Sequence, residues 1–176
     1  MNPSLLQRID RALRSAVPGL SALVFALLGV VPLHLPVFGP ISPLLALIPI
    51  YYWAVHRPDL MTFSLAFAIG LVHDALAGAP LGVHSLVYLL CYWAAFSQRR
   101  FLAGKGFFVL WWGMLLIAAL GVGLEWLVFS VFYARLMPVE PLAFRALLTT
   151  ALFPLVGGLM IQIHRLMLFQ PRSWRA

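Results

Sequence analysis

Two acidic residues lie inside strongly apolar stretches of this chain, and several histidines accompany them. Asp74 lies in the segment GLVHDALAGAPLGVHSL, residues 70–86, between His73 and His84. Glu125 is the acidic residue of LLIAALGVGLEWLVFS, residues 115–130. Carboxylates and imidazoles in such surroundings bind metal ions, carry protons or form ion pairs with one another and with arginine. The chemistry open to this protein therefore depends on what surrounds these two acids.

The spacing of these side chains argues against a metal centre or an enzyme. Adjacent residues of a helix point about 100° apart, so His73 and Asp74 do not face one ion. The spacings H-x3-H and H-E-x-x-H are absent from the sequence, although the residue types suit a divalent cation. Ser85 follows His84 but lacks the G-x-S-x-G motif of a nucleophilic serine. The sequence therefore predicts no catalytic residue, no cofactor and no metal ligand.

The composition is that of an integral membrane protein. Charged residues make up only 10% of the 176 residues and the mean hydropathy is +0.98, whereas about a quarter of a soluble domain is charged. The net charge of +7 comes from basic residues that flank the apolar stretches. Anionic lipid headgroups explain that charge without nucleic acid.

The apolar stretches predict helices that cross the membrane. Four long runs are almost free of charge, and the first two are too long for one crossing of about 20 residues. The breakers HLPVFGPISP at 34–43 and AGAPLG at 77–82 divide those two runs. Backbone groups in lipid must bond internally, so the spans are helical. We therefore expect residues 1–176 to form one all-α integral membrane domain of six transmembrane helices, at about 17–36, 41–56, 60–77, 81–98, 106–133 and 143–167.

The basic residues orient these helices. If both termini are cytoplasmic, ten of the twelve arginine and lysine residues face the cytoplasm, as the positive-inside rule predicts. Arg135 and Arg145 then lie on the outer side. Three aromatic clusters fall at the cytoplasmic edge in this topology, and the one at 107–113 is typical of an interfacial belt. They are YYW at 51–53, YW at 92–93 and FFVLWWG at 107–113.

Both acids then lie in the outer half of the membrane. Asp74 is ~21 Å along its predicted helix from the cytoplasmic side and Glu125 is ~28 Å along its own, at 1.5 Å per residue. In a structural interpretation, Asp74 bonds to the backbone of the turn at 78–82, and Glu125 bonds to a neighbouring helix, Arg135 or Arg145. In a second interpretation the acids line a polar pocket that opens outwards. A proton relay is the third, although it would need acids at several depths.

The pocket interpretation also involves histidines. The histidines expected near the mouth of the pocket are His34, His73 and His84.

Ala22 and Ala26 lie on one face of the first predicted helix, where small side chains allow close helix approach. That face either packs inside this protein or docks against another membrane protein.

Two segments in order resemble the rod shape-determining protein MreD family. They are PLLALIPIYYWAVHRPDL at 43–60 and GLVHDALAGAPLGVHSLVYLLCYW at 70–93. The family pattern has a proline-containing second helix that ends in aromatic residues, then a G-L-x-x-D element and a P-L-G turn. Its matches in this chain are Gly70, Leu71, Asp74, Pro80, Leu81 and Gly82.

The resemblance implies a function as well as a fold. It implies a non-enzymatic component of the rod complex, or elongasome, in the bacterial cytoplasmic (inner) membrane. The expected partners are an MreC-like bitopic protein and, indirectly, MreB, RodA and a class B penicillin-binding transpeptidase, which together organise peptidoglycan synthesis for cell shape. The family is similar in fold to the S components of energy-coupling factor vitamin transporters. Solute capture as such a substrate-binding subunit is the alternative function.

Overall fold

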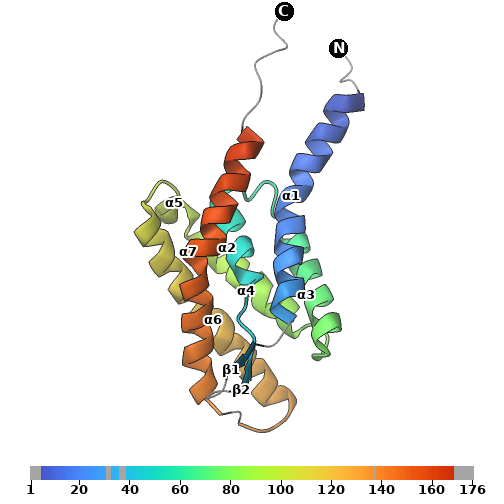
Figure 1. Ribbon diagram of the computed structural model, residues 1–176. Helices are drawn as coiled ribbons and strands as arrows, with labels where there is room; N and C mark the ends of the chain where they lie inside the picture. Colours follow the sequence, from blue (N-terminus) through green and yellow to red (C-terminus); the bar gives the residue numbers. More distant parts are fainter. Residues whose placement is uncertain (1–4, 31–32, 36–38, 137, 169–176) are drawn as a thin grey trace, which may run out of the picture.

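The computed structural model describes residues 5–30, 33–35, 39–136 and 138–168, with side chains for 16–30, 42–136, 138–139 and 141–166. These residues form seven α-helices and one antiparallel hairpin (Figure 1). The elements are α1 Leu5–Val30, β1 Leu33–Leu35, β2 Gly39–Ile41, α2 Leu47–His56, α3 Phe63–Ala77, α4 Val83–Ser97, α5 Arg99–Leu102, α6 Phe107–Phe132 and α7 Glu140–Leu168. The predicted helical class is thus confirmed for the described residues, apart from the short hairpin.

The short helix α2 lies at the centre of the bundle. The longer helices pack as successive neighbours in the order α1, α3, α4, α6 and α7, and α2 contacts α1, α4, α6 and α7. All but one of its ten residues are buried. α1 begins and α7 ends at one end of the bundle, and the hairpin lies at the opposite end (Figure 1). We call that opposite end the hairpin end.

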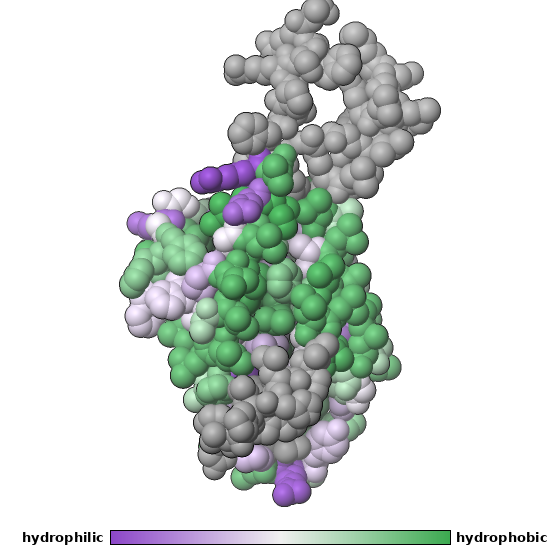
Figure 2. Space-filling view, in the orientation of Figure 1, coloured by the Kyte–Doolittle hydropathy of each residue, from purple (hydrophilic) through white to green (hydrophobic). Residues whose placement is uncertain are grey.

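The lengths of the helices set what each can do in a membrane. Among the described residues, Phe107–Phe132 and Pro141–Leu166 are long and apolar enough to cross a bilayer by length and composition. Helices α3 and α4 have 15 residues each, or about 22 Å, against a hydrocarbon core of about 30 Å. The face seen in Figure 2 is mostly hydrophobic over its middle and carries hydrophilic residues toward both ends. The count of six crossings stays a prediction.

The chain between α1 and α2 differs from the predicted helices. α1 ends at Val30, six residues before the predicted boundary, and α2 begins at Leu47 instead of residue 41. The irregular backbone before α2 bonds to side chains of α7. Arg145 Nε donates to the Ser42 carbonyl at 2.6 Å, and the Leu44 N–H donates to Thr149 Oγ1 at 3.1 Å. Non-helical backbone is tolerated at such a position because protein groups replace the missing helical bonds.

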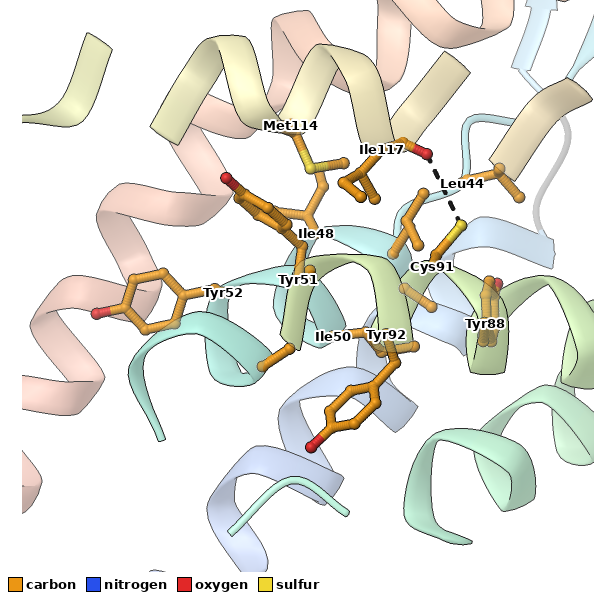
Figure 3. Close-up of a cluster of buried hydrophobic side chains, with 14 of the residues drawn as sticks. Leu44, Ile48, Ile50, Tyr51, Tyr52, Tyr88, Cys91, Tyr92, Met114 and Ile117 are labelled. Atoms are coloured by element: carbon orange, nitrogen blue, oxygen red, sulfur yellow. Dashed lines mark hydrogen bonds between the residues drawn. The ribbon is translucent and has the colours of Figure 1, made fainter. Parts of the chain in front are cut away.

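Several aromatic residues expected at the interface are instead buried. Tyr51, Trp53 and Tyr92 are at most 1% exposed, and Figure 3 shows Tyr51 and Tyr92 among buried aliphatic side chains. Each finds a hydrogen-bond acceptor: Tyr51 Oη donates to the Leu110 carbonyl at 3.0 Å, Trp53 Nε1 to Ser21 Oγ at 3.0 Å, and Tyr92 Oη to the Met61 carbonyl. We call these three residues the aromatic core. Their side chains therefore pack inside the bundle.

Other aromatic residues of the same segments do face outward. Trp93, Phe108 and Trp112 are each more than half exposed. They remain compatible with an interfacial position, where amphipathic rings are favoured.

Candidate functional site

A close approach between α3 and α4 positions the acidic residue of α3. Gly70 lies directly against the backbone of Ser85, so that a Cβ on Gly70 would overlap the Ser85 N and Cα atoms. Asp74 follows one helical turn later on the same face of α3. The absence of a side chain at Gly70 therefore allows Asp74 to reach the start of α4.

Asp74 binds the first turn of α4. Its Oδ2 accepts from the Gly82 N–H at 2.8 Å and its Oδ1 from the His84 N–H at 3.0 Å, and the residue is fully buried. These are N–H groups of a helix N-terminus, which lack intrahelical acceptors and favour a negative charge. The carboxylate thus caps α4, the contact that the structural interpretation of Asp74 expected.

The turn between the two helices has the geometry that its glycines permit. Gly78 ends α3 with φ of +65°, and Gly82 precedes α4 with φ of +104°. Glycine adopts such positive φ values without the steric cost that a Cβ would add. Pro80 lies between them, and its carbonyl accepts from the Val83 N–H at 3.3 Å. The A-G-A-P-L-G segment thus turns the chain tightly enough for the Asp74 carboxylate of α3 to bind the first turn of α4.

A chain of polar side chains continues from Asp74 across the bundle. His84 Nδ1 lies 2.7 Å from Asp74 Oδ1, and its Nε2 lies 3.5 Å from Glu125 Oε1. Arg145 Nη1 donates to the same Glu125 Oε1 at 2.7 Å. A nitrogen so close to a carboxylate oxygen must carry the proton, so His84 donates to Asp74 through Nδ1. We call Asp74, His84, Glu125 and Arg145 the polar cluster; it joins α3, α4, α6 and α7.

A cavity of about 390 Å³ opens beside the polar cluster at the hairpin end. Its walls come from the ends of α1 and α3, from Ser42, and from α6 and α7. His73, His84, Glu125 and Arg145 supply its polar lining. His73 is also stacked on His84, with ring centroids 4.2 Å apart, and its Nδ1 lies 2.5 Å from Tyr88 Oη. We call this cavity the polar pocket.

Among the residues that the structure describes, one buried polar atom of the pocket's lining residues lacks a hydrogen-bond partner. Glu125 is only 4% exposed, and its Oε2 has no hydrogen-bond partner among the residues that the structure describes. Its other oxygen, Oε1, takes both Arg145 and His84. A buried carboxylate oxygen without a donor is costly. The site can therefore accept a further hydrogen bond.

The other residues singled out by sequence lie in different places. Ala22 and Ala26 are fully buried inside the bundle, which fits packing within this chain and leaves no exposed docking face at their side chains. The side chain of His34 lies outside the described residues. Arg135 is exposed after the end of α6, and it is Arg145 that pairs with Glu125.

Sequence reasoning did not single out three residues that support the site. Tyr88 lies one helical turn after His84 and forms a hydrogen bond with His73. Ser42 in the irregular segment accepts from Arg145, and Thr149 of α7 accepts from the same segment. The i, i+4 spacing of His84 and Tyr88 was visible in the sequence. The contacts of Ser42 and Thr149 depend on segments about a hundred residues apart and left no local signal.

In chemical terms, the polar cluster links four helices at one level of the bundle. Its two acids bind the N-terminus of α4, the imidazole of His84 and the guanidinium of Arg145. No group of three or more His, Cys, Asp or Glu side chains that could hold a metal ion occurs among the described residues. The arrangement supplies stabilising cross-links and a pocket with one free acceptor.

The comparisons with known proteins identify the family. The family described as rod shape-determining protein MreD matches residues 11–163, which include the whole polar cluster and the aromatic core. Searches of curated proteins and of solved structures found no match. Because the match spans most of the sequence, the chain belongs to the MreD family of rod shape-determining membrane proteins.

Proposed function

We propose that this chain is a non-enzymatic component of the rod complex that binds an MreC-like bitopic membrane protein. Through that partner it would act with MreB, RodA and a class B penicillin-binding transpeptidase in organising peptidoglycan synthesis. The observation that carries the proposal is the family match over residues 11–163. That family determines cell shape and is not known as an enzyme family. The proposed location is the bacterial cytoplasmic (inner) membrane.

The contacts of the buried acids support a scaffold role. Asp74 caps α4, and Glu125 pairs with Arg145 of α7. Buried charges that join several helices hold those helices in one arrangement, because separating them would leave a charge unpaired in an apolar interior. A fixed arrangement of helices is what a partner-binding scaffold requires.

We further propose six membrane crossings with both termini cytoplasmic. The beginning of α1 and the end of α7 at one end of the bundle support this topology (Figure 1). Lys105 and Arg135 are both exposed but lie on opposite sides in the proposal. In intact cells, a membrane-impermeant maleimide should label Arg135→Cys and leave Lys105→Cys unlabelled. The native Cys91 is 1% exposed and should not react. Equal labelling of both variants would contradict the topology.

Purification from the native membrane tests the partner. The tagged chain is extracted in mild detergent, and the proteins that accompany it are identified by mass spectrometry. Recovery of an MreC-like bitopic protein with cell-wall synthases is the expected result. A transmembrane coupling protein with paired ATPases would contradict the proposal and would support solute capture instead. The family match does not favour that alternative.

The variant Asp74→Leu separates a structural role from an interaction role. We expect it to lower the thermal stability of the purified protein, because the N–H groups of Gly82 and His84 lose their acceptor. The protein that remains folded should still recover the partner. Unchanged melting together with loss of the partner would make Asp74 an interaction residue.

A further inference from the structure

Glu125, whose Oε2 lacks a hydrogen-bond partner among the described residues, lines a cavity of ligand size. The polar pocket has a volume of about 390 Å³, and small-molecule sites usually occupy about 300–1,000 Å³. Glu125 lines this cavity and is only 4% exposed. Its Oε2 lacks a donor among the described residues, although its Oε1 has Arg145. Oε1 thus takes part in the contacts that hold the helices together, and Oε2 is available to a hydrogen-bond donor from outside the described residues.

The charge and bonding capacity of the pocket define the missing group. A carboxylate oxygen only accepts hydrogen bonds, so its ligand must supply an N–H or O–H. The polar cluster contains two carboxylates and a single guanidinium, so an added cation is favoured whenever His84 is neutral. A primary ammonium provides both the positive charge and the N–H donors. A quaternary ammonium provides the charge without a donor.

The opposite end of the ion pair suits an anion. The side chain of Arg145 is 23% exposed and lines the same pocket. Its guanidinium has five N–H donors, and the bonds to Glu125 and Ser42 use two of them. A phosphate located a few bonds from the ammonium would therefore find donors on Arg145 while the ammonium meets Glu125.

An apolar hollow adjoins the polar pocket between α6 and α7. It has a volume of about 240 Å³ and shares Glu125, Phe129 and Arg145 with the polar pocket. Val122 and Leu142 supply part of its apolar wall. Among the described residues, α6 and α7 supply the two segments that are long and apolar enough to cross a membrane. An acyl chain in this hollow would place its headgroup at the Glu125–Arg145 pair.

We propose that the polar pocket binds a primary ammonium through Glu125 Oε2, and that the ammonium belongs to a zwitterionic lipid headgroup such as phosphoethanolamine. Arg145 binds the phosphate of that headgroup, and the hollow between α6 and α7 takes the start of an acyl chain. This site is independent of the protein partner proposed above.

Competition between two lipids tests the proposal. The purified full-length chain in detergent is mixed with equal amounts of phosphatidylethanolamine and phosphatidylcholine that have identical acyl chains, and native mass spectrometry compares the two adducts. The lipids differ only at the ammonium, which has N–H donors in phosphatidylethanolamine and three methyl groups in their place in phosphatidylcholine. A hydrogen bond to a charged partner predicts a preference of about tenfold or more for phosphatidylethanolamine. Equal adducts would overturn the proposal.

Two variants connect the preference to the pocket. Glu125→Gln can keep an oxygen for Arg145 while placing an amide donor at the position of Oε2, so the preference should disappear. Ala77→Trp fills the pocket from an exposed position of α3 without altering the ion pair. Ala75→Trp is the matched control, because Ala75 is also exposed on α3 and does not line the pocket. A preference that survives both pocket variants would place the site elsewhere and overturn the assignment.

A soluble amine is separated from a lipid by the same assay. Free ethanolamine is added to the lipid mixture, with choline as the counterpart whose ammonium carries no N–H donor. If the headgroup is the ligand, millimolar ethanolamine should displace little phosphatidylethanolamine, because it lacks the phosphate and the acyl chain. Strong displacement by ethanolamine but not by choline would retain the ammonium site and overturn its assignment to a lipid.

Discussion

The polar cluster and the aromatic core meet the same requirement in different ways. Both hold polar atoms in an apolar interior where no bulk water can satisfy them. In the polar cluster, ionisable side chains from four helices pair with one another, and Asp74 also accepts from backbone N–H groups of the first turn of α4. In the aromatic core, each neutral donor bonds to one acceptor, either a backbone carbonyl or the hydroxyl of Ser21.

The difference lies in how much each residue depends on its neighbours. Removal of one charge from a buried set leaves its partner uncompensated. Removal of one tyrosine hydroxyl leaves a backbone carbonyl that still has its own backbone hydrogen bond or a second lone pair. The polar cluster should therefore respond to mutation as one unit, whereas the aromatic core should respond residue by residue. Three substitutions test this contrast, in decreasing order of expected effect, and a fourth, in an exposed ion pair, gives the comparison outside both regions.

Arg145→Met should have the largest effect. It leaves Glu125 buried without its cation, which we expect to cost about 3 kcal/mol, at the lower end for a broken buried pair because His84 stays near. The double variant Arg145→Met/Glu125→Met should recover most of the loss. Thermal and denaturant unfolding in detergent, followed by circular dichroism, provides the double-mutant cycle. Additive losses in the double variant would show that the polar cluster is not one unit.

Gly70→Ala tests the close helix approach on which the polar cluster depends. The added methyl overlaps the Ser85 backbone, so α3 and α4 must separate, at a cost of about 1–3 kcal/mol. Gly123→Ala is the control, because no atom lies within 4 Å of its added Cβ. That control should be neutral or slightly stabilising in the same unfolding assay. Equal effects of the two substitutions would mean that the approach at Gly70 has no special role.

Tyr51→Phe tests the aromatic core. It removes the bond to the Leu110 carbonyl and keeps the ring, so the loss should be about 1 kcal/mol. Tyr133→Phe, in which the original side chain is more than half exposed, should leave the unfolding free energy unchanged. A loss at Tyr51 as large as that of Arg145→Met would remove the distinction between the two regions.

Asp59→Asn should have the smallest effect. The hydrogen bond from Arg57 lowers the pKa of Asp59 below its usual value of 3.8, yet the side chain is 59% exposed and solvent screens the pair. A carboxyl whose pKa is lowered by folding adds stability above its unfolded pKa and loses it as the pH falls through the folded value. Any difference between wild type and Asp59→Asn should be present at neutral pH and vanish well below pH 3.8. A difference that increases in acid would contradict this sign.

The family and the helical class could be predicted because their signals are local. Apolar runs separated by breakers predicted helices, and α3, α4 and α6 begin and end within about three residues of the predicted positions. The turn residues from Gly78 to Gly82 and the proximity of Asp74 also follow from neighbouring positions in the chain. The hairpin and the short α2 could not be predicted, because the backbone between them is held by long-range bonds to Arg145 and Thr149 of α7.

Hydropathy, charge and motif order are properties of the chain alone, and they are enough to predict a helical membrane protein of the MreD family. The pairing of Glu125 with Arg145, the core positions of Ala22 and Ala26, and the burial of Tyr51 and Trp53 become visible only once the helices are packed. A single sequence shows which side chains an apolar helix carries. It does not show which neighbour each face meets, because that depends on how all the helices pack together.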